Sequence, residues 1–460
     1  MINLRCHIKD RAHRPGDERM TYTETVNLIF SGISFVICLL FAHYIVLAAA
    51  GVFACRRYPH TDRKNRYGLI IPAKNEEAVI DALIQSVRRA DYPQELLDIF
   101  VVAHNCSDRT AEIARRTDAH VYEYNNPDEN TMGCAIRYLF GKIEEDFGTA
   151  SYDGFFIFNA DNTFAKDYFD RMNDAFEYYD RKYVISSFRQ GSNFNENMMT
   201  VMYGAYFATS CYLGARGRTV LNTSNRIFGC GYLFNSDLVK DGWDYYSLTE
   251  DLEFTAREFL KGTEIRYCDD AVFYDEQPTT FRIMWRQRLR WARGVIIVSR
   301  AHLASCIRAI FDPGRKNRFA VFDMATFISR VITVLIFLFL LRSLLLLFAP
   351  LFGESVSRAF LYWDSTKPWW YNLFCSGDTG ALFSVVAGFI NAYAVAMVTY
   401  LLTMFLGRKR FRSVSAGKTA AGLFLFPFFL LSQFVLDIQA LFSRNLAWKQ
   451  IPHTGRQDSR

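Results

Sequence analysis

Hydrophobic and polar positions divide the chain into three stretches of different character. Residues 25–55 carry no formal charge, and at about 1.5 Å per residue a helix of this length can cross a hydrocarbon core of roughly 30 Å. From Gly68 the pattern changes to short apolar runs that alternate with helical stretches, and long apolar runs return beyond Lys316. The pattern predicts an N-terminal transmembrane helix, an α/β domain and a C-terminal membrane region.

The middle stretch has the alternation of strands and helices that is typical of α/β proteins. Short apolar runs with the length of buried strands occur at residues 68–71, 99–103, 120–124 and 155–158. Helical segments separate them, which predicts a mostly parallel, doubly wound sheet that binds its ligands at the carboxyl ends of the strands. The expected ligand-binding loops are therefore residues 72–77, 103–108 and 159–162.

Composition agrees with a membrane protein. The apolar share of 51% and the aromatic share of 16% are high for a soluble chain. The ten cysteines form no C-x-x-C pair, so neither a zinc knuckle nor a disulfide framework is indicated. The net charge of +6 is modest, and the arginines crowd beside apolar runs, as in segments that face anionic lipid. Membrane lipid is an expected partner, whereas nucleic acid is not.

Charges beside the first apolar run predict its orientation. The segment after it is strongly basic, with Arg56, Arg57, Arg63, Lys64 and Arg66. Since basic residues stay on the cytoplasmic side, the α/β domain should be cytosolic. Residues 1–19 are polar and basic without an apolar segment, so they are not a signal peptide. They are either an extension upstream of a true start at Met20 or a genuine polar tail, and both possibilities stay open.

The domain organisation follows from these boundaries. We expect a polar leader at 1–19, a transmembrane helix at 20–56, a cytosolic domain at 57–304 that ends in an amphipathic interface helix, and a membrane region with about three hydrophobic segments at 305–460.

The C-terminal membrane region leaves the side of the C-terminus open. Its first apolar run, 319–348, contains Asp323, Arg330 and Arg342; Arg330 can snorkel to an interface, and Arg342 is a candidate for a polar cavity. Four spans with an outward N-terminus put the C-terminus outside, yet the basic residues after 443 prefer the inside. A re-entrant hairpin at 419–443, kinked at Pro427, would reconcile the two.

Six motifs in the α/β domain resemble the membrane-integrated family 2 glycosyltransferases, the group that includes cellulose, hyaluronan and poly-N-acetylglucosamine synthases. They occur in the family's order, between residues 68 and about 300. They are Ile70-Ile-Pro-Ala-Lys-Asn-Glu-Glu77, the 101–114 block, Asn159-Ala-Asp-Asn162, Gly229-Cys-Gly231, Thr249-Glu-Asp251 and Gln287-x-x-Arg290-Trp291. The resemblance implies a GT-A fold that binds a nucleoside-diphosphate sugar and inverts the anomeric centre during transfer.

The resemblance also implies a role for each motif. Asp251 is the expected base that takes a proton from the acceptor hydroxyl, and Asp161 is the expected ligand of Mn²⁺ or Mg²⁺. Trp291 would stack on the acceptor sugar, and Arg290 would help to hold the diphosphate. The donor-binding residues are Pro72, Asn75, Glu76, His104, Asn159 and Asp161. The acceptor- and diphosphate-binding residues are Gly229, Gly231, Glu250, Gln287, Arg290 and Trp291.

Purely structural interpretations also exist for these residues. Asp161 could be a turn-forming aspartate, and Asp251 a helix N-terminal acid that interacts with the helix dipole. The segment 281–300 carries six arginines among apolar residues, so it could be an amphipathic helix lying on anionic lipid. Membrane contact and sugar binding by this helix are compatible.

Three positions depart from the family pattern, all on the donor side. His104 stands where the family has an aspartate that contacts the nucleotide base. Asn159 replaces the first aspartate of Asp-x-Asp, and Met132-Gly133 replaces a Lys-Gly pair. The acceptor motifs are complete, which favours a working enzyme.

The functional hypothesis is a multi-pass cell-membrane enzyme with a cytosolic catalytic domain. It would use a nucleotide sugar, expected to be a UDP-sugar, to build a cell-surface polysaccharide processively. One alternative is non-processive transfer to a lipid-linked acceptor. Another is a catalytically silent subunit that binds glycan or a partner synthase. The sequence does not identify the sugar, the linkage or the oligomeric state.

Overall fold

The computed structural model describes residues 20–354, 368 and 381–443. The expected leader at 1–19 and the basic tail after residue 443 lie outside the described residues. The chain forms two compact units: one consists of Leu39–Thr333 with the segment that begins at Ala392, and the other consists of the segment up to Cys38 with Val334–Asn391. The first unit contains the α/β domain and the candidate site.

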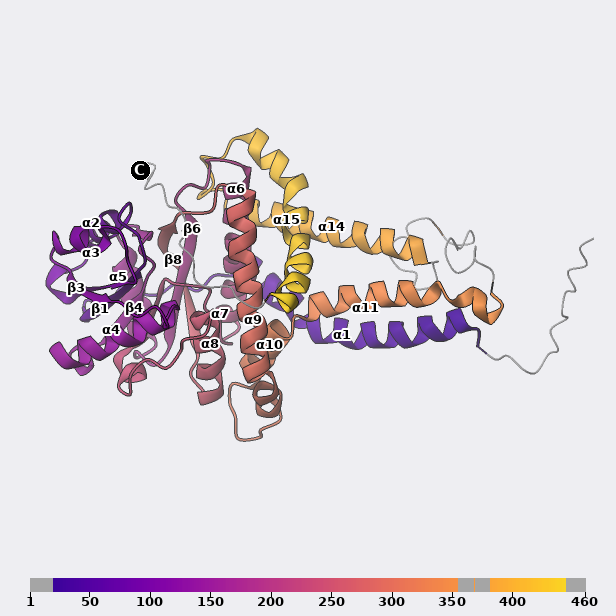
Figure 1. The fold of residues 1–460 in the computed structure, drawn as a ribbon, viewed down its shortest axis with the longest axis horizontal. Coiled ribbons are helices and arrows are strands. Elements are labelled where there is room, and N and C mark those ends of the chain that lie inside the picture. Colours follow the sequence, from indigo (N-terminus) through magenta and orange to yellow (C-terminus); the bar gives the residue numbers. More distant parts are fainter. Residues whose placement is uncertain (1–19, 355–367, 369–380, 444–460) are drawn as a thin grey trace, which may run out of the picture. The chain divides into compact units, whose positions relative to one another are not determined.

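The α/β domain is built on one eight-stranded sheet with the order β3-β2-β1-β4-β7-β6-β8-β5 (Figure 1). Strands β3, β2, β1 and β4 are parallel, as the alternation predicts. The second half is mixed, because β7 runs antiparallel to β4 and β6, and β5 runs antiparallel to β8. The predicted fold class is confirmed. The strands are β1 (Tyr67–Ala73), β2 (Leu97–His104), β3 (His120–Tyr124), β4 (Gly154–Ile157), β5 (Thr163–Phe164), β6 (Val184–Gly191), β7 (Tyr232–Asn235) and β8 (Ile265–Asp275).

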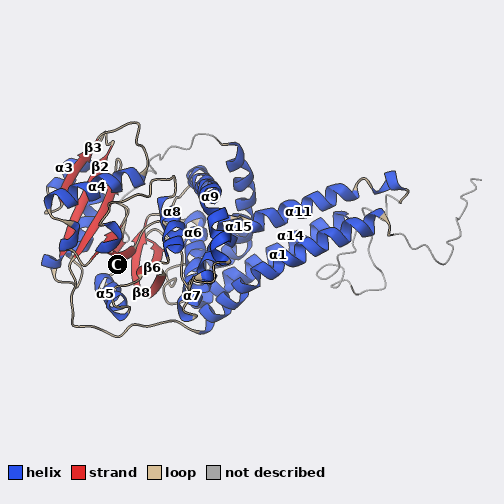
Figure 2. Cartoon of the chain, turned by 90° about the horizontal axis from the view of Figure 1, so that it is seen from below, coloured by secondary structure: helices blue, strands red, loops and turns tan. Residues whose placement is uncertain are grey.

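Helices cover both faces of the sheet (Figure 2). In β1, Leu69 and Ile71 pack into a cluster with residues of α2 (Ile80–Arg88) and α5 (Tyr168–Tyr178), whereas Ile70 packs into a second cluster with α4 (Met132–Asp146) and α8 (Glu250–Lys261). Successive side chains of a strand point to opposite faces. Because both faces are covered, every residue of β1 is buried.

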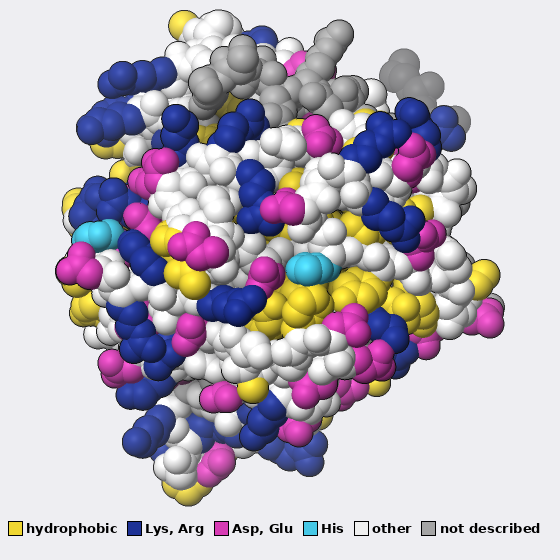
Figure 3. Space-filling view, turned by 90° about the vertical axis from the view of Figure 1, so that its left-hand side faces the viewer, with side chains coloured by type: hydrophobic (Ala, Val, Ile, Leu, Met, Phe, Trp, Pro, Cys, Tyr) yellow, Lys and Arg dark blue, Asp and Glu magenta, His cyan; other side chains and the backbone are white. Residues whose placement is uncertain are grey.

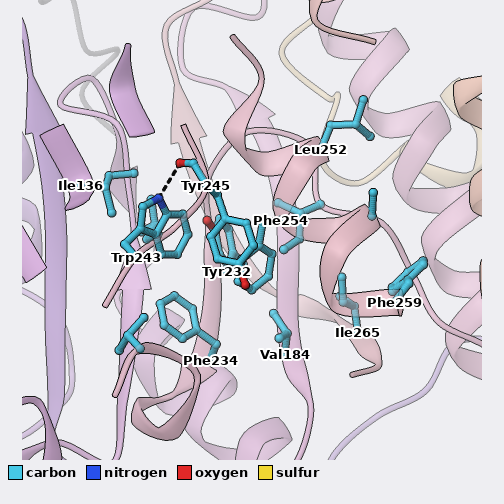
Figure 4. Packing of buried hydrophobic residues seen from close by; sticks show 14 of the residues in the cluster. Ile136, Val184, Tyr232, Phe234, Trp243, Tyr245, Leu252, Phe254, Phe259 and Ile265 are labelled. Carbon is cyan, nitrogen blue, oxygen red and sulfur yellow. Dashed lines mark hydrogen bonds between the residues drawn. The ribbon is translucent and has the colours of Figure 1, made fainter. Parts of the chain in front are cut away.

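The cluster under α8 holds the start of that helix in place. Figure 4 shows Trp243, Tyr245 and Phe254 packed together beside β7. The Trp243 and Phe254 rings stack with centroids 5.5 Å apart, and the Trp243 indole N–H donates to the Tyr245 carbonyl oxygen at 2.8 Å. Large aromatic side chains with satisfied polar atoms make a stiff support, so the first turn of α8, which contains Asp251, has a defined position.

The face that carries the edge strand β3 has charges of both signs interspersed over it, with one apolar patch beside a histidine (Figure 3). Charged side chains at a sheet edge discourage pairing with another strand. Glu123, in β3, pairs with Arg115 at 2.5 Å, which places a charged pair along this edge.

Several helices pack beside the mixed half of the sheet. A long helix runs from α6 (Met198–Thr209) through a π-helical segment (Ser210–Ala215) into α7 (Arg216–Val220). Helix α9 (Phe281–Ile310) packs on α8, on α10 (Arg318–Ile328) and on α15 (Ala416–Phe442). Because α9 continues to Ile310, the expected domain boundary at residue 304 falls inside a helix.

Helix α15 is continuous through Pro427, which contradicts the re-entrant hairpin considered as one possibility for 419–443. A proline removes one backbone donor and disturbs the carbonyls of the preceding turn. The donor missing at Pro427 would have bonded to the Leu423 carbonyl oxygen. The next carbonyl oxygen, that of Phe424, accepts a hydrogen bond at 2.8 Å from the Tyr393 hydroxyl of the neighbouring helix α14 (Ala381–Leu406), which ties the two helices together beside the proline.

Three helices in the described part of the chain are long and apolar enough to cross a membrane: Tyr22–Phe53, Val385–Leu406 and Ala416–Phe442. A bent pair, Arg318–Ile328 with Thr333–Leu346, is a further candidate, with an angle of 49° at the break. The apolar run predicted at 319–348 is therefore broken. Arg330 lies at this break with a φ of +52°.

Candidate active site

A cavity of about 300 Å³ opens at the carboxyl ends of the parallel strands and is bounded by helices of the same unit. Its residues come from the strand loops, from the first turn of α8 and from α6, α9, α10 and α15. They include Pro72, Lys74, Glu76, Met132, Asn159, Asp161, Arg189, Tyr206, Phe207, Gly229, Glu250, Asp251, Glu276, Arg286, Gln287, Arg290, Trp291, Phe327, Arg330 and Gln433.

The donor end of the cavity contains the turn at 159–162. The Asn162 backbone N–H donates to the Asn159 carbonyl oxygen at 3.1 Å, and the Asn162 side-chain oxygen accepts from the Asn159 N–H at 3.0 Å. Asp161 is held in this turn by the Glu276 backbone N–H at 3.3 Å and by the Asn162 amide at 3.1 Å. Residue 159 contributes its backbone N–H and carbonyl oxygen to the two hydrogen bonds with Asn162, so an asparagine is compatible with this turn.

Two of the expected donor-binding residues, His104 and Asn75, are absent from the cavity lining that the described residues form. His104 is fully buried; its Nε2 lies 2.7 Å from the Glu129 carbonyl oxygen and its ring stacks on Tyr124. Burial lowers the pKa of His104. Asn75 has a φ of +56°, and its side-chain oxygen accepts from the Ser107 N–H at 2.7 Å. Their contact with a donor stays a prediction, whereas their present contacts join the loops after β1 and β2.

Asp251 lies in the first turn of α8 and faces the cavity. Its Oδ2 accepts a hydrogen bond of 2.6 Å from the backbone N–H of Gly229, which has a φ of +83°. Glycine suits this left-handed backbone conformation. Gly231, with a φ of +77°, is absent from the cavity lining; a Cβ there would lie 2.3 Å from the Phe273 ring. Within the protein, the two glycines therefore allow close contact with Asp251 and Phe273.

Glu250, Asp251 and Arg290 form a cluster of three ionisable groups. Burial raises the pKa of Glu250, and the charge of Asp251 raises it further. Burial also raises the pKa of Asp251, whereas the Gly229 N–H and the charge of Arg290 lower it. Arg290 is the compensating cation: burial lowers its pKa, and the two carboxylates raise it. A carboxylate with a raised pKa, kept ionised by a neighbouring arginine, has the properties of a general base near neutral pH.

The predicted residues of α9 line the cavity along one side of the helix. Positions three and four apart lie on the same side, as Gln287, Arg290 and Trp291 do. Gln287 accepts a hydrogen bond of 2.8 Å from the Tyr203 hydroxyl, and Arg290 donates to the Leu248 carbonyl oxygen at 2.9 Å. The Trp291 ring meets the Phe207 ring nearly edge-on at 6.1 Å. These contacts fix the side chains before any ligand arrives.

Arg288 corrects the interpretation of α9 as a helix whose arginines face lipid. It is 2% exposed, donates to the Phe429 carbonyl oxygen at 2.8 Å and to the Ser432 hydroxyl at 2.9 Å, and stacks over the Phe429 ring. The reason is that α15 packs against this side of α9 and contributes a carbonyl oxygen and a hydroxyl oxygen that accept from the guanidinium.

Sequence reasoning missed Arg189 and Phe207, which also line the cavity. The Arg189 Nε donates to the Asp275 carboxylate at 2.7 Å, and its guanidinium lies 3.9 Å from the Phe207 ring centre. Asp275 is fully buried. An arginine inside the buried strand β6 was the available signal, because a buried charge requires a partner.

Gly294 sets the distance between α9 and the first turn of α8. A Cβ at Gly294 would lie 2.2 Å from Thr249 Cγ2. We expect Gly294→Ala to push the two helices apart and to lower the transfer rate by roughly 10²-fold, because small misplacements of catalytic groups have effects of that size. The measurement is the initial rate of nucleotide release.

Gly141→Ala is the matched control for this prediction. Gly141 lies inside α4 with nothing within 4 Å of its Cβ position, so the substitution gains helix propensity of about 0.5–1 kcal/mol without a clash. Equal rates for the two variants would contradict the packing argument.

The donor end is suited to a divalent cation bound through Asp161. Among the described residues, no group of three or more His, Cys, Asp or Glu side chains could hold a metal ion alone. Mg²⁺ and similar ions often bind through one or two carboxylates plus substrate phosphates. Burial, with the charges of Asp161, Asp108 and Glu276, raises the pKa of Glu76 to about 9. Glu76 is therefore protonated near neutral pH, and the neighbouring carboxylates of Asp161, Asp108 and Glu276 are the groups that fit a cation arriving with the diphosphate.

Several curated proteins are similar to this chain. It is 28% identical over 259 residues to the probable glycosyltransferase YdaM of Bacillus subtilis, which covers 54% of this chain and 60% of that protein. It is 27% identical to the beta-monoglucosyldiacylglycerol synthase of Synechocystis sp. (49% of this chain, 47% of the relative). It is 25% identical to the poly-beta-1,6-N-acetyl-D-glucosamine synthase of Staphylococcus epidermidis (49% and 53%). The matches span about half to three fifths of these relatives.

Among solved structures, a mannosyltransferase from Pyrobaculum calidifontis, in complex with GDP-Man and Mn²⁺, aligns with 90% of this chain and 99% of its own, at 14% identity and a TM-score of 0.49. The model of the glycosyltransferase-like family 2 matches residues 65–294, the segment that holds the parallel strands, Asp161, Asp251 and the Gln-x-x-Arg-Trp residues. This match extends over half of the 460 residues, and the chain therefore belongs to glycosyltransferase family 2.

Proposed function

We propose that this protein is an inverting glycosyltransferase that moves a sugar from a nucleoside diphosphate, expected to be UDP, to a hydroxyl group of a membrane-associated acceptor. The observation that carries the proposal is a single cavity that brings together Asp161, from the donor loops, and Asp251 with Trp291, from the acceptor motifs. Donor and acceptor chemistry need this juxtaposition, because the reacting atoms must approach each other closely.

The cavity residues divide the reaction between them. Asp251 accepts the proton of the acceptor hydroxyl as its oxygen bonds to the anomeric carbon, and the bond from that carbon to the diphosphate oxygen breaks on the opposite side. Arg290 keeps Asp251 ionised before the step. Trp291 presents an aromatic face to the acceptor sugar. Asp161 would hold a divalent cation, which would neutralise negative charge on the leaving diphosphate.

The favoured acceptor is the end of a growing cell-surface polysaccharide, extended processively. The similarity to poly-beta-1,6-N-acetyl-D-glucosamine synthases supports this choice, as do the candidate membrane helices on both sides of the family 2 segment. In this proposal residues 57–304 form a cytosolic catalytic domain, residues 20–56 and 305–460 hold it at the cell membrane, and Mn²⁺ or Mg²⁺ is the cofactor.

A lipid-linked acceptor is the second candidate. It is supported by the similarity to beta-monoglucosyldiacylglycerol synthases, which is of the same order as the similarity to the polysaccharide synthases. The third possibility, a silent subunit, has less support, because a cavity joins Asp161 and Asp251. The open site expected for an enzyme also included His104, which is buried outside this lining.

Product analysis tests the proposal. The protein, purified in detergent with membrane lipids, is offered radiolabelled UDP-glucose, UDP-galactose, UDP-glucuronic acid and UDP-N-acetylglucosamine with Mn²⁺ or Mg²⁺. We expect labelled polymer from one donor; label that extracts into organic solvent would indicate a lipid acceptor instead. No product above that of an Asp251→Asn variant with any donor would overturn the enzymatic proposal.

A further inference from the structure

Two polar side chains from the C-terminal third of the chain reach the cavity. Arg330 comes from the break between α10 and α11 (Val331–Leu346), and Gln433 comes from α15. Neither belongs to the family 2 segment at 65–294. The sequence pattern assigns both to membrane runs, where Arg330 was expected to snorkel to an interface. They therefore add to the cavity a part that the motifs do not describe.

A hydrogen-bond network fixes both side chains. The Gln433 side-chain oxygen accepts from Arg288 at 3.1 Å, and the Gln433 amide donates to Asp437 at 2.8 Å. Asp437 pairs with the Arg330 guanidinium at 3.1 Å and accepts from the Thr333 hydroxyl at 2.5 Å. Asp437 is 4% exposed and Arg288 is 2% exposed. Buried networks of this kind hold their members rigidly.

The backbone at Arg330 indicates that its side chain is needed. Helix α10 ends at Ile328 with Ser329 as its C-cap, and Arg330 follows with a φ of +52°. Glycine is the favoured residue at this position after a helix, since side chains strain the left-handed conformation. Strained residues tend to occur where a side chain has a function. Here the strained residue reaches the cavity.

The surroundings of Arg330 and Gln433 favour an uncharged, hydroxyl-rich ligand. Asp437 already neutralises the guanidinium, so a second anion gains little there. The Arg330 Nε–H has no hydrogen-bond partner among the described residues. The Gln433 amide already donates one N–H to Asp437 and accepts from Arg288, so its second N–H and its second oxygen lone pair remain for a ligand. Trp291, Phe207 and Tyr206 line the same cavity. Planar polar groups beside aromatic rings suit the hydroxyl edge and the apolar face of a pyranose.

We propose that Arg330 and Gln433 form a subsite that binds a sugar unit of the acceptor through its hydroxyl groups. The proposal rests on the proposed transferase function and adds that α15 and the α10–α11 break complete the acceptor site. The acceptor sugar then contacts helices outside the family 2 segment, which gives the C-terminal helices a role in acceptor selection.

The test compares two arginines with the same backbone conformation. Arg330→Gly removes the side chain and suits the φ of +52°; it is made together with Asp437→Asn so that no buried carboxylate loses its cation. Arg181→Gly is the matched control, because Arg181 also has a positive φ, +59°, and also pairs with an aspartate, Asp153, away from the cavity. Asp437→Asn alone and Gln433→Ala complete the set.

The probes are cellobiose, gentiobiose and N,N′-diacetylchitobiose, with inorganic phosphate as the anionic comparison. Two readouts are taken in detergent: the KM of each disaccharide in stimulating UDP release, and the rise in melting temperature that it causes. We expect one disaccharide to act on the wild-type protein, and its KM to rise about tenfold in Arg330→Gly/Asp437→Asn and about threefold in Gln433→Ala. The KM of the donor should stay at its wild-type value in these variants. In Arg181→Gly, the disaccharide KM and the rise in melting temperature should also match those of the wild-type protein.

The outcomes separate this proposal from the proposed function. An unchanged disaccharide KM in both cavity variants, or stabilisation by phosphate but by no disaccharide, would overturn the subsite. If the wild-type protein releases no UDP from any donor, the transferase proposal fails by itself. The melting temperatures then still decide the subsite: stabilisation by a disaccharide that disappears in the cavity variants supports it, and no stabilisation of the wild-type protein rejects it.

Discussion

Replacing Asp251 by asparagine is expected to lower the rate of sugar transfer by about 10³-fold, the size of effect typical of a lost general base. Asparagine has nearly the same shape, and its side-chain oxygen can still accept the hydrogen bond from the Gly229 N–H that Asp251 Oδ2 accepts at 2.6 Å. The fold and the donor site should therefore persist while the proton acceptor is lost. Single-turnover transfer of radiolabelled sugar measures the effect, and binding of UDP measures the intact donor site.

The control for this prediction lies in the same helical turn. Glu253 accepts from the Ser247 N–H at 2.8 Å and pairs with Arg257, and it does not line the cavity. If Asp251 acted only through the helix dipole, Glu253→Gln and Asp251→Asn would have similar small effects on stability and little effect on rate. A transfer rate within threefold of wild type in Asp251→Asn would reject its role as the base.

Replacing Arg290 by glutamine is expected to move the acidic limb of the pH–rate profile upward by about one pH unit or more, the effect of losing a neighbouring opposite charge. The sign follows from the surroundings of Asp251. Burial raises its pKa and Arg290 lowers it, so removing Arg290 lets the pKa rise further. Since the base acts as the carboxylate, less of it is active near pH 7. The rate should fall there and recover in more alkaline buffer.

The recovery distinguishes two roles of Arg290. An arginine that only holds the diphosphate would lower the rate equally at every pH when it is removed, whereas an arginine that keeps Asp251 ionised gives a loss that alkali reverses. Arg290→Lys should leave the acidic limb close to its wild-type position, because the positive charge that lowers the pKa of Asp251 remains. Arg293→Gln is the control on the same helix, since Arg293 bonds to the Ala440 carbonyl oxygen and does not line the cavity. An unmoved acidic limb in Arg290→Gln would contradict the electrostatic argument.

Local sequence patterns predicted the elements of the catalytic domain well. The run at 120–124 is strand β3, and the run at 99–103 lies inside β2. Apolar periodicity reports on such elements because each must bury one or both faces. The other four strands, β5 to β8, were not predicted. Strands β5 and β7 have only two and four residues, and polar or charged residues such as Arg189 in β6 and Asp269 in β8 interrupt the apolar pattern of the longer two. The motif residues Asp161, Asp251 and Gln287 were predicted from their order along the chain, and the structure brings them to one cavity.

Local sequence pattern is enough to predict apolar helices on both sides of an α/β domain and to identify short motifs that resemble those of family 2 glycosyltransferases, since both depend on neighbouring residues. Which charged side chains reach the cavity depends instead on the tertiary packing. Arg288 and Arg290 are two residues apart on one helix, yet α15 buries the first while the second meets Glu250 and Asp251. Arg330 reaches the cavity only because the helix breaks there with a left-handed residue. Such placements depend on packing between segments that are distant in the chain, and the local sequence pattern does not predict that packing.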